Sequence, residues 1–332
     1  MELLRKISFF VFVLFILLLF VWALYLPKQD VTKLIEQTIA KQKDTLDIYY
    51  KGVTLQEIVN GVKYWEIKAA ESSLNKTIGI ASLEKTEGTF YKNKKPALMF
   101  TAPTAIWKIN EKEIILRKPV GFDSLSNKRK LSTISKEKNF FNFSSYAENK
   151  GFFFKAEELV WNIKSKAIVC KNELWIKKGN ISGHAKKLKG DVGLEEIEIT
   201  GDPVIYIKNH SITTIEAEKF LINGISNTVK AQTHVLIKVD KLTGTTQFLT
   251  YNQSTGIIKI KNGIVVKYEN YKISADTALY NIKNEKMILS SNGILTRGSS
   301  KLSGDVIIID MKTKKVSIQG KSRAIIPDEE IK

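Results

Sequence analysis

The chain has 332 residues, of which 43% are hydrophobic and 10% aromatic, so it can bury a sizeable core and disorder is not expected. Its net charge of +18 comes mainly from lysines spread singly along the chain, with one short cluster at 128–130, which argues against a dedicated nucleic-acid-binding arm. The single cysteine, Cys170, excludes an internal disulfide framework.

The first predicted element is an apolar run at residues 7–26, twenty residues without a charge. At about 1.5 Å per residue this run spans the hydrocarbon core of a bilayer, which is about 30 Å thick. It is longer than the hydrophobic part of a typical signal peptide and ends without a small-residue cleavage site, so we expect an uncleaved transmembrane anchor. Lysines lie on both sides of the run, and their distribution does not decide its orientation.

A linker over residues 27–47 follows, in which Asp30 can cap a short helix. From Ile48 onward the helical period disappears, and apolar residues alternate with polar ones over short runs. This alternation predicts half-buried β-strands for the rest of the chain.

The clearest strand pair lies within residues 264–275. A two-residue turn at Glu269 and Asn270 pairs Tyr268 with Tyr271, so the alternation continues through the reversal of the chain. We therefore expect a hairpin whose register is encoded locally.

Three segments repeat the same pattern: an alanine, an acid directly after it, an apolar residue and an asparagine five and six positions on, and two later glycines. The alanines are Ala156, Ala217 and Ala275, the acids Glu157, Glu218 and Asp276, and the asparagines Asn162, Asn223 and Asn281. These marks lie 61 and 58 residues apart. A weaker fourth copy begins at Ala69, and its distance of 87 residues from Ala156 falls to 59 without the polar segment 123–150. The pattern predicts a β-repeat of about 60 residues, stacked to bury its apolar faces.

The expected organisation follows from these elements. It comprises a cytoplasmic N-terminus (1–6), the anchor (7–26), the linker (27–47), a first β-unit (48–122), a polar insertion (123–150), three further repeats (151–326) and a tail (327–332).

No catalytic or cofactor-binding pattern is visible in the sequence. His184, His210 and His234 are isolated from one another, so we expect neither a metal site nor a general base. Cys170 lies in an apolar run and is interpreted as a small core residue. The acids of the repeat recur at repeat spacing and are interpreted as structural residues at strand ends. We therefore expect no enzyme, no cofactor and no metal.

Two groups of segments resemble a known family. Residues 47–57 (DIYYKGVTLQE) and 61–70 (GVKYWEIKAA), after a single span, resemble the LptC family of lipopolysaccharide export proteins. Residues 273–281 (ISADTALYN) and 301–310 (KLSGDVIIID) resemble the OstA-type repeats shared with LptA and the N-terminal part of LptD. The roughly 300 residues after the span exceed the length expected of an ordinary LptC, as though repeats were appended.

The resemblance implies an all-β fold, an open twisted β-jellyroll of antiparallel strands with an apolar lining, after one transmembrane helix. It implies an inner-membrane protein with most of its chain in the periplasm, as part of a lipopolysaccharide conduit. The implied partners are lipopolysaccharide, LptB-, LptF- and LptG-like subunits of an ABC transporter, and an LptA-like protein, with no nucleic acid. Each methylene exposed to water costs about 0.8 kcal/mol, so acyl chains need an apolar shelter to cross an aqueous gap.

Candidate lipid contacts are the apolar residues at alternating positions. They are Trp65, Ile67, Phe152, Phe154, Trp161, Ile215, Phe220, Val235, Ile237, Phe248, Ile264, Val266, Tyr268, Tyr271 and Ile273. The alternative for each is that it only fills a closed core.

A second candidate site is the last strand segment, residues 314–326, because an open jellyroll leaves its terminal strands unpaired. Val316, Ile318, Ala324 and Ile325 are the expected contacts of an LptA-like partner, unless Pro327 and the acidic tail block pairing. The alternative function is an anchored scaffold of the cell envelope that carries no lipid.

Overall fold

In the computed structural model, residues 48–92, 94–123, 152–191 and 195–326 are described, and the regular elements within them are all β-strands. The strands are β1 (Ile48–Val59), β2 (Val62–Asn75), β3 (Ile80–Lys92), β4 (Lys95–Lys108), β5 (Glu113–Arg117), β6 (Val120–Asp123), β7 (Phe152–Asn162), β8 (Ala167–Lys178), β9 (Ile181–Asp191), β10 (Glu196–Thr200), β11 (Val204–Lys208), β12 (Ile212–Glu216), β13 (Lys219–Asn223), β14 (Thr228–Val239), β15 (Leu242–Asn252), β16 (Ile257–Ile260), β17 (Ile264–Tyr268), β18 (Tyr271–Ala275), β19 (Thr277–Asn281), β20 (Lys286–Arg297), β21 (Ser300–Asp310), β22 (Lys315–Gln319) and β23 (Arg323–Ile325). The predicted all-β fold is confirmed for this part of the chain.

The predicted anchor (7–26), the linker with its short helix (27–47), most of the polar insertion (124–150) and the tail (327–332) lie outside the described residues. Within the described ranges, no helix has the length and hydropathy that a membrane crossing requires.

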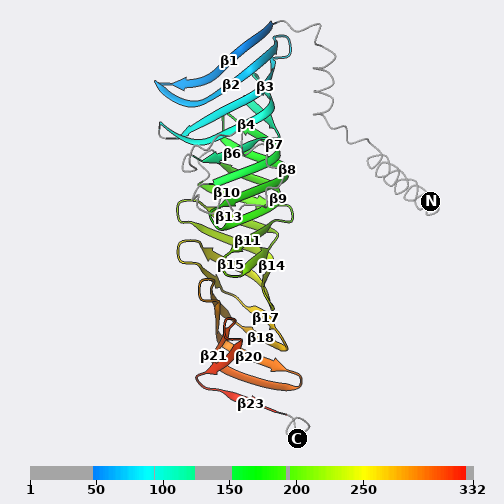
Figure 1. Cartoon of the computed structure of the whole chain (residues 1–332), viewed down its shortest axis with the longest axis vertical. Helices are drawn as coiled ribbons and strands as arrows, with labels where there is room; N and C mark the ends of the chain where they lie inside the picture. Colours follow the sequence, from blue (N-terminus) through cyan, green and yellow to red (C-terminus); the bar gives the residue numbers. More distant parts are fainter. Residues whose placement is uncertain (1–47, 93, 124–151, 192–194, 327–332) are drawn as a thin grey trace, which may run out of the picture. The chain divides into compact units, whose positions relative to one another are not determined.

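All described strand pairs are antiparallel, and each strand pairs with strands that lie close to it in the chain, although not always with the next one. Figure 1 shows the strands of this unit stacked in sequence, from β1 at one end to β23 at the other. The predicted hairpin is confirmed: β17 pairs with β18, Tyr268 faces Tyr271, and Glu269 takes the positive φ of 51° that the tight turn requires.

A level of the stack is either one long strand or two short strands that follow each other in the chain. Most levels bend at one position, and the bends form a line that we call the seam. The seam divides each long strand into two halves, and at several levels it splits one strand into two short ones. Arm A contains β5, β10, β13, β16, β19, β22 and the adjoining halves of the long strands; arm B contains β6, β11, β12, β17, β18, β23 and the other halves.

The seam is built from β-bulges, and their spacing matches the repeat seen in the sequence. Pairs of residues with positive φ begin at Asn172 in β8, Thr233 in β14 and Ser291 in β20, which are 61 and 58 residues apart. A bulge inserts unpaired residues and increases the local twist, so repeating it bends every level at the same place.

The bulges explain why the alternation comes in short runs although several strands are long. β1 to β4 have 12 to 14 residues, and β14 and β20 have 12 each. The apolar alternation ends at the seam because a bulge interrupts it, although the strand continues on the other side.

Glu218 and Asp276, two acids of the repeat, lie at the seam between strands, whereas Glu157 lies within β7 at its register shift. Asp276 accepts a hydrogen bond from the Asn292 amide at 2.7 Å, and Glu218 lies 2.5 Å from the Nδ1 atom of His234. Each carboxylate therefore holds the second residue of a bulge, which is a structural role.

The asparagines of the repeat begin the turns at the far end of arm A. The Asn223 Oδ1 atom accepts hydrogen bonds from the Ser226 backbone N at 2.8 Å and from its hydroxyl at 2.9 Å. Asn75 and Asn162 accept the same backbone bond in their own turns, and Asp310 does so with its carboxylate. This Asx geometry is why the residue recurs.

Replacing Asn223 by alanine is expected to lower the free energy of unfolding by about 1 kcal/mol, because the Ser226 N–H loses its acceptor. Asn223→Asp keeps the acceptor, as Asp310 does naturally, and should lose much less. Denaturant unfolding of the two variants measures the difference, and equal losses would contradict the proposed role of the side-chain oxygen.

Candidate functional site

The inward faces of the two arms pack against each other. Trp65 and Phe90 of arm B meet Trp161 of arm A, with ring centroids 5.4 and 4.4 Å apart, and Trp107 of arm A lies 6.2 Å from Trp65. One apolar cluster continues from β2 through β21. The interior is thus a continuous apolar layer between two arms that the seam joins along one side.

The structure places nearly all of the predicted lipid contacts in this layer. Fully or almost fully buried are Trp65, Ile67, Phe152, Phe154, Trp161, Ile215, Phe220, Val235, Ile237, Ile264, Val266, Tyr268 and Ile273. Tyr271 is partly buried and packs against the same cluster. The side chains fill the interior, so acyl contact at these positions requires the arms to separate.

Phe248 is the exception, and its predicted place in the lining is corrected. It lies on the outer face of arm A with 47% of its surface exposed. Strict alternation from Leu242 would point it inward, but the bulge opposite Gln247 shifts the pattern by one residue and Leu249 points inward instead.

Opposite the seam, the free ends of the arms form what we call the rim. Lys92 at the end of β3 bonds Glu195 across the rim at 2.6 Å, which raises the pKa of Lys92. Further contacts across the rim join Lys178 Nζ to Asn227 Oδ1 at 3.0 Å, Asn209 Nδ2 to the Ile282 carbonyl at 3.0 Å, and the Lys166 ammonium to the Tyr64 ring at 4.2 Å.

These rim contacts are few, polar and partly exposed. Exposed polar pairs of this kind contribute about 0–1 kcal/mol each. The rim is therefore the side on which the arms separate most easily. The sequence alone does not reveal these residues, because each pair joins segments that are 49 to 103 positions apart in the chain.

The predicted C-terminal edge is a true sheet edge. β22 and β23 pair only with β21 among the described strands, and they split at Gly320, whose φ is 86°. Val316 and Ile318 are partly buried against the core, whereas Ala324 and Ile325 are exposed. β1 is the opposite edge and, in the part of the chain that the structure describes, pairs only with β2.

The isolated histidines His184 and His210 lie on the outer face and in a turn, and the cysteine lies in the core. His184 stacks between Trp175 and Tyr206 on the outer face, and His210 lies in the turn after β11. Burial raises the pKa of the Cys170 thiol to about 12, so it stays protonated in the core. In the described ranges, no three His, Cys, Asp or Glu side chains come together as a metal site.

Comparison with known proteins matches the two parts of the chain to two family models. The family model for lipopolysaccharide-assembly, LptC-related proteins matches residues 11–206, more than half of the chain. The model for LptA/(LptD N-terminal domain) LPS transport proteins matches residues 216–315. No curated protein matches the chain.

Among solved structures, the chain is similar to LptH, described as the LptA-homologous periplasmic component of the lipopolysaccharide transport device of Pseudomonas aeruginosa. The match has 10% identity and a TM-score of 0.31, and covers 35% of this chain and 94% of LptH.

Both family models describe lipopolysaccharide assembly or transport, and neither family is enzymatic. The chain therefore has a role in lipopolysaccharide transport. LptC-type proteins normally face the periplasm, and the resemblance noted in residues 47–70 and 273–310 is confirmed over most of the sequence. The chain belongs to the LptC-related lipopolysaccharide-assembly family and carries LptA-like repeats in its C-terminal part.

Proposed function

We propose that the chain is a periplasmic conduit for lipopolysaccharide, anchored in the inner membrane by residues 7–26. It accepts lipid from an ABC transporter with LptB-, LptF- and LptG-like subunits and passes it to an LptA-like protein. The observation that carries this proposal is the continuous apolar layer between two arms that polar contacts close on one side only.

Acyl chains enter between the arms from the rim. Opening the rim breaks weak polar pairs and exposes interior side chains such as Phe220 and Ile237. Lipid methylenes then replace the lost apolar contacts, at about 25 cal/mol for each Å² kept from water. Sugars and phosphates remain outside in water.

Photo-crosslinking in cells tests this route with a neighbouring control position. A photoreactive residue in place of Phe220, which points inward, should give lipopolysaccharide adducts that depend on ATP hydrolysis. The same residue in place of Leu221, which points outward from the same strand, should give none. Adducts at neither position, or equally at both, would contradict entry into the interior.

Lipid leaves at the C-terminal edge, where a strand of the LptA-like partner extends the sheet. β1 follows the predicted anchor in the chain, so the β1 edge is the end that receives lipid from the transporter. Crosslinkers in place of Val316 and Ile318 should give an adduct with an LptA-like protein, whereas one in place of Thr250, in the middle of the sheet, should not. A Val316 crosslinker that yields no such adduct in cells contradicts docking at this edge.

An anchored envelope scaffold is the second candidate, and the filled interior favours it. Mass spectrometry of lipids that co-purify with the full chain separates the two functions. Bound glycolipid supports the conduit, and its absence supports the scaffold.

A further inference from the structure

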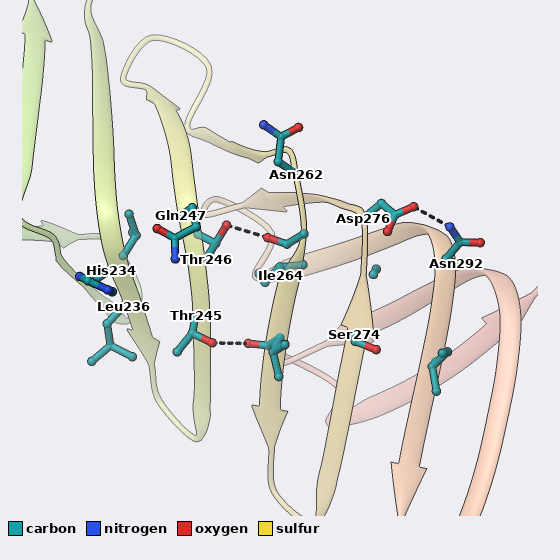
Figure 2. A pocket seen from close by; sticks show the side chains of 15 residues that line it. His234, Leu236, Thr245, Thr246, Gln247, Asn262, Ile264, Ser274, Asp276 and Asn292 are labelled. Carbon is teal, nitrogen blue, oxygen red and sulfur yellow. Dashed lines mark hydrogen bonds between the residues drawn. The ribbon is translucent and has the colours of Figure 1, made fainter.

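A groove of about 660 Å³ crosses the outer face of arm B beside the seam, over β14, β15, β17, β18 and β20 (Figure 2). Its floor is one cross-strand row in which each residue pairs with the next: Leu236, Thr245, Val265, Ser274 and Ile294. These side chains alternate with buried residues such as Val235 and Val266, so the groove lies on the face opposite the lipid interior.

The wall of the groove on the seam side is polar. His234 and Asn292 occupy positive-φ bulge positions, and Asn262 has a φ of 67° at the break between β16 and β17. His234 and Asn292 contact Glu218 and Asp276, whereas the exposed amides of Gln247 and Asn262 have no protein partner in the described part of the chain. In Figure 2, Gln247 lies next to Thr246, and Asn262 lies beyond Ile264 at the end of the groove.

A basic row lies beside the groove, on the side away from the seam, and is placed there by the cross-strand register. Two residues farther along each strand from the floor, a second row runs across the sheet: Lys238, Thr243, Lys267, Lys272, Thr296 and Lys301. Lys238 is paired with Glu216 at 2.6 Å, but the other three lysines are exposed and form no ion pair within the described residues. Lys267 and Lys272 stand directly opposite each other, an arrangement that costs stability between like charges.

The floor, the polar wall and the neighbouring basic row together define a ligand class. Amide groups both donate and accept, as hydroxyl-rich sugars require, and unpaired lysines attract phosphate or carboxylate. A peptide strand cannot extend the sheet here, because the backbone groups of these strands are already used in the ladder. We propose that this groove binds an acidic oligosaccharide, with sugar rings over the floor, hydroxyls on Gln247 and Asn262, and anionic groups on Lys267 and Lys272.

Two sources share this chemistry: the phosphorylated sugars of lipopolysaccharide and the carboxylate-bearing glycan of the cell wall. The site does not depend on acyl chains entering the interior, so it can hold true even if the conduit proposal fails.

Binding to the full chain in detergent, measured by calorimetry, tests the proposal with four probes. The probes are phosphorylated core oligosaccharide released from lipid A, the same oligosaccharide after dephosphorylation, soluble cell-wall glycan fragments, and polyglutamate. Binding of the first probe identifies lipopolysaccharide sugars, and binding of the third identifies cell-wall glycan. Polyglutamate binding as tight as either glycan would make the groove an acidic-peptide site, and no glycan binding at all would overturn the proposal.

Two variants and a control complete the test. Lys267→Gln with Lys272→Gln should weaken binding about tenfold and remove its salt dependence, while thermal stability holds or rises because the repulsion is relieved. Asn262→Gly with Gln247→Ala keeps the positive φ at position 262 and should also weaken binding of the dephosphorylated probe. Lys230→Gln with Lys259→Gln removes two exposed charges from arm A; an equal loss there would show that only net charge matters and would overturn the assignment.

Discussion

Replacing Trp161 by alanine is expected to lower the free energy of unfolding by about 3–5 kcal/mol, the largest effect of any single substitution considered for this chain. Trp161 is 3% exposed and packs against Trp65 and Phe90 from the opposite arm. Alanine leaves a cavity where the arms meet, and neighbouring strands held by ladder hydrogen bonds can fill it only in part. Chemical denaturation of the detergent-solubilised chain measures the loss.

Two controls define the cause of this loss. Among the described residues, the buried indole N–H of Trp161 has no hydrogen-bond partner, so Trp161→Phe removes an unsatisfied donor and should cost far less than alanine. Phe248→Ala removes an aromatic ring from the outer face and should change stability by about 0.5 kcal/mol or less. Equal losses for Trp161→Ala and Phe248→Ala would mean that the arms do not depend on their shared core.

Crosslinking the rim is expected to abolish lipopolysaccharide loading. Lys178→Cys and Asn227→Cys, in a Cys170→Ala background, place two thiols where a 3.0 Å hydrogen bond now joins the arms. A short bismaleimide then holds the rim closed, and the filled interior has no room for acyl chains. Mass spectrometry of bound glycolipid, before and after crosslinking, measures the loss.

A matched crosslink within one arm distinguishes the effect of rim closure on loading from the effect of chemical modification. Lys241 and Glu269 lie in neighbouring turns of arm B, with their charged groups 3.1 Å apart. Crosslinking cysteines at these two positions uses the same chemistry and leaves the rim free, so loading should persist. Full loading of the rim-crosslinked protein would show that lipid does not enter between the arms.

Local signals made much of the fold predictable. The two-residue turn at Glu269 and Asn270 fixes the pairing of Tyr268 with Tyr271, and period-two alternation marks the strands on each side of the seam. The repeated asparagines and acids were visible in the sequence because the same turn and bulge recur in each repeat.

Other features depend on contacts that the sequence does not display. The alternation of apolar and polar residues does not reveal where a bulge changes the inward-facing positions, which is why Phe248 was expected inside. The rim bridge between Lys92 and Glu195 joins turns 103 positions apart, and whether the lining is open or filled depends on how two arms pack. The outer groove is formed by residues that show no motif in the sequence. Only the cross-strand register brings them together.

The regular bulges also bear on how such a chain can change in length. Each repeat contributes four levels of strand, such as β12 with β13, β14, β15, and β16 with β17. Among the described strands, each level forms its ladder hydrogen bonds only with the levels directly before and after it. Neighbouring strands are about 4.8 Å apart, so one additional unit extends the stack by about 19 Å without altering the others. A protein built in this way can be matched to the width of the space it crosses by duplicating a single segment of its gene.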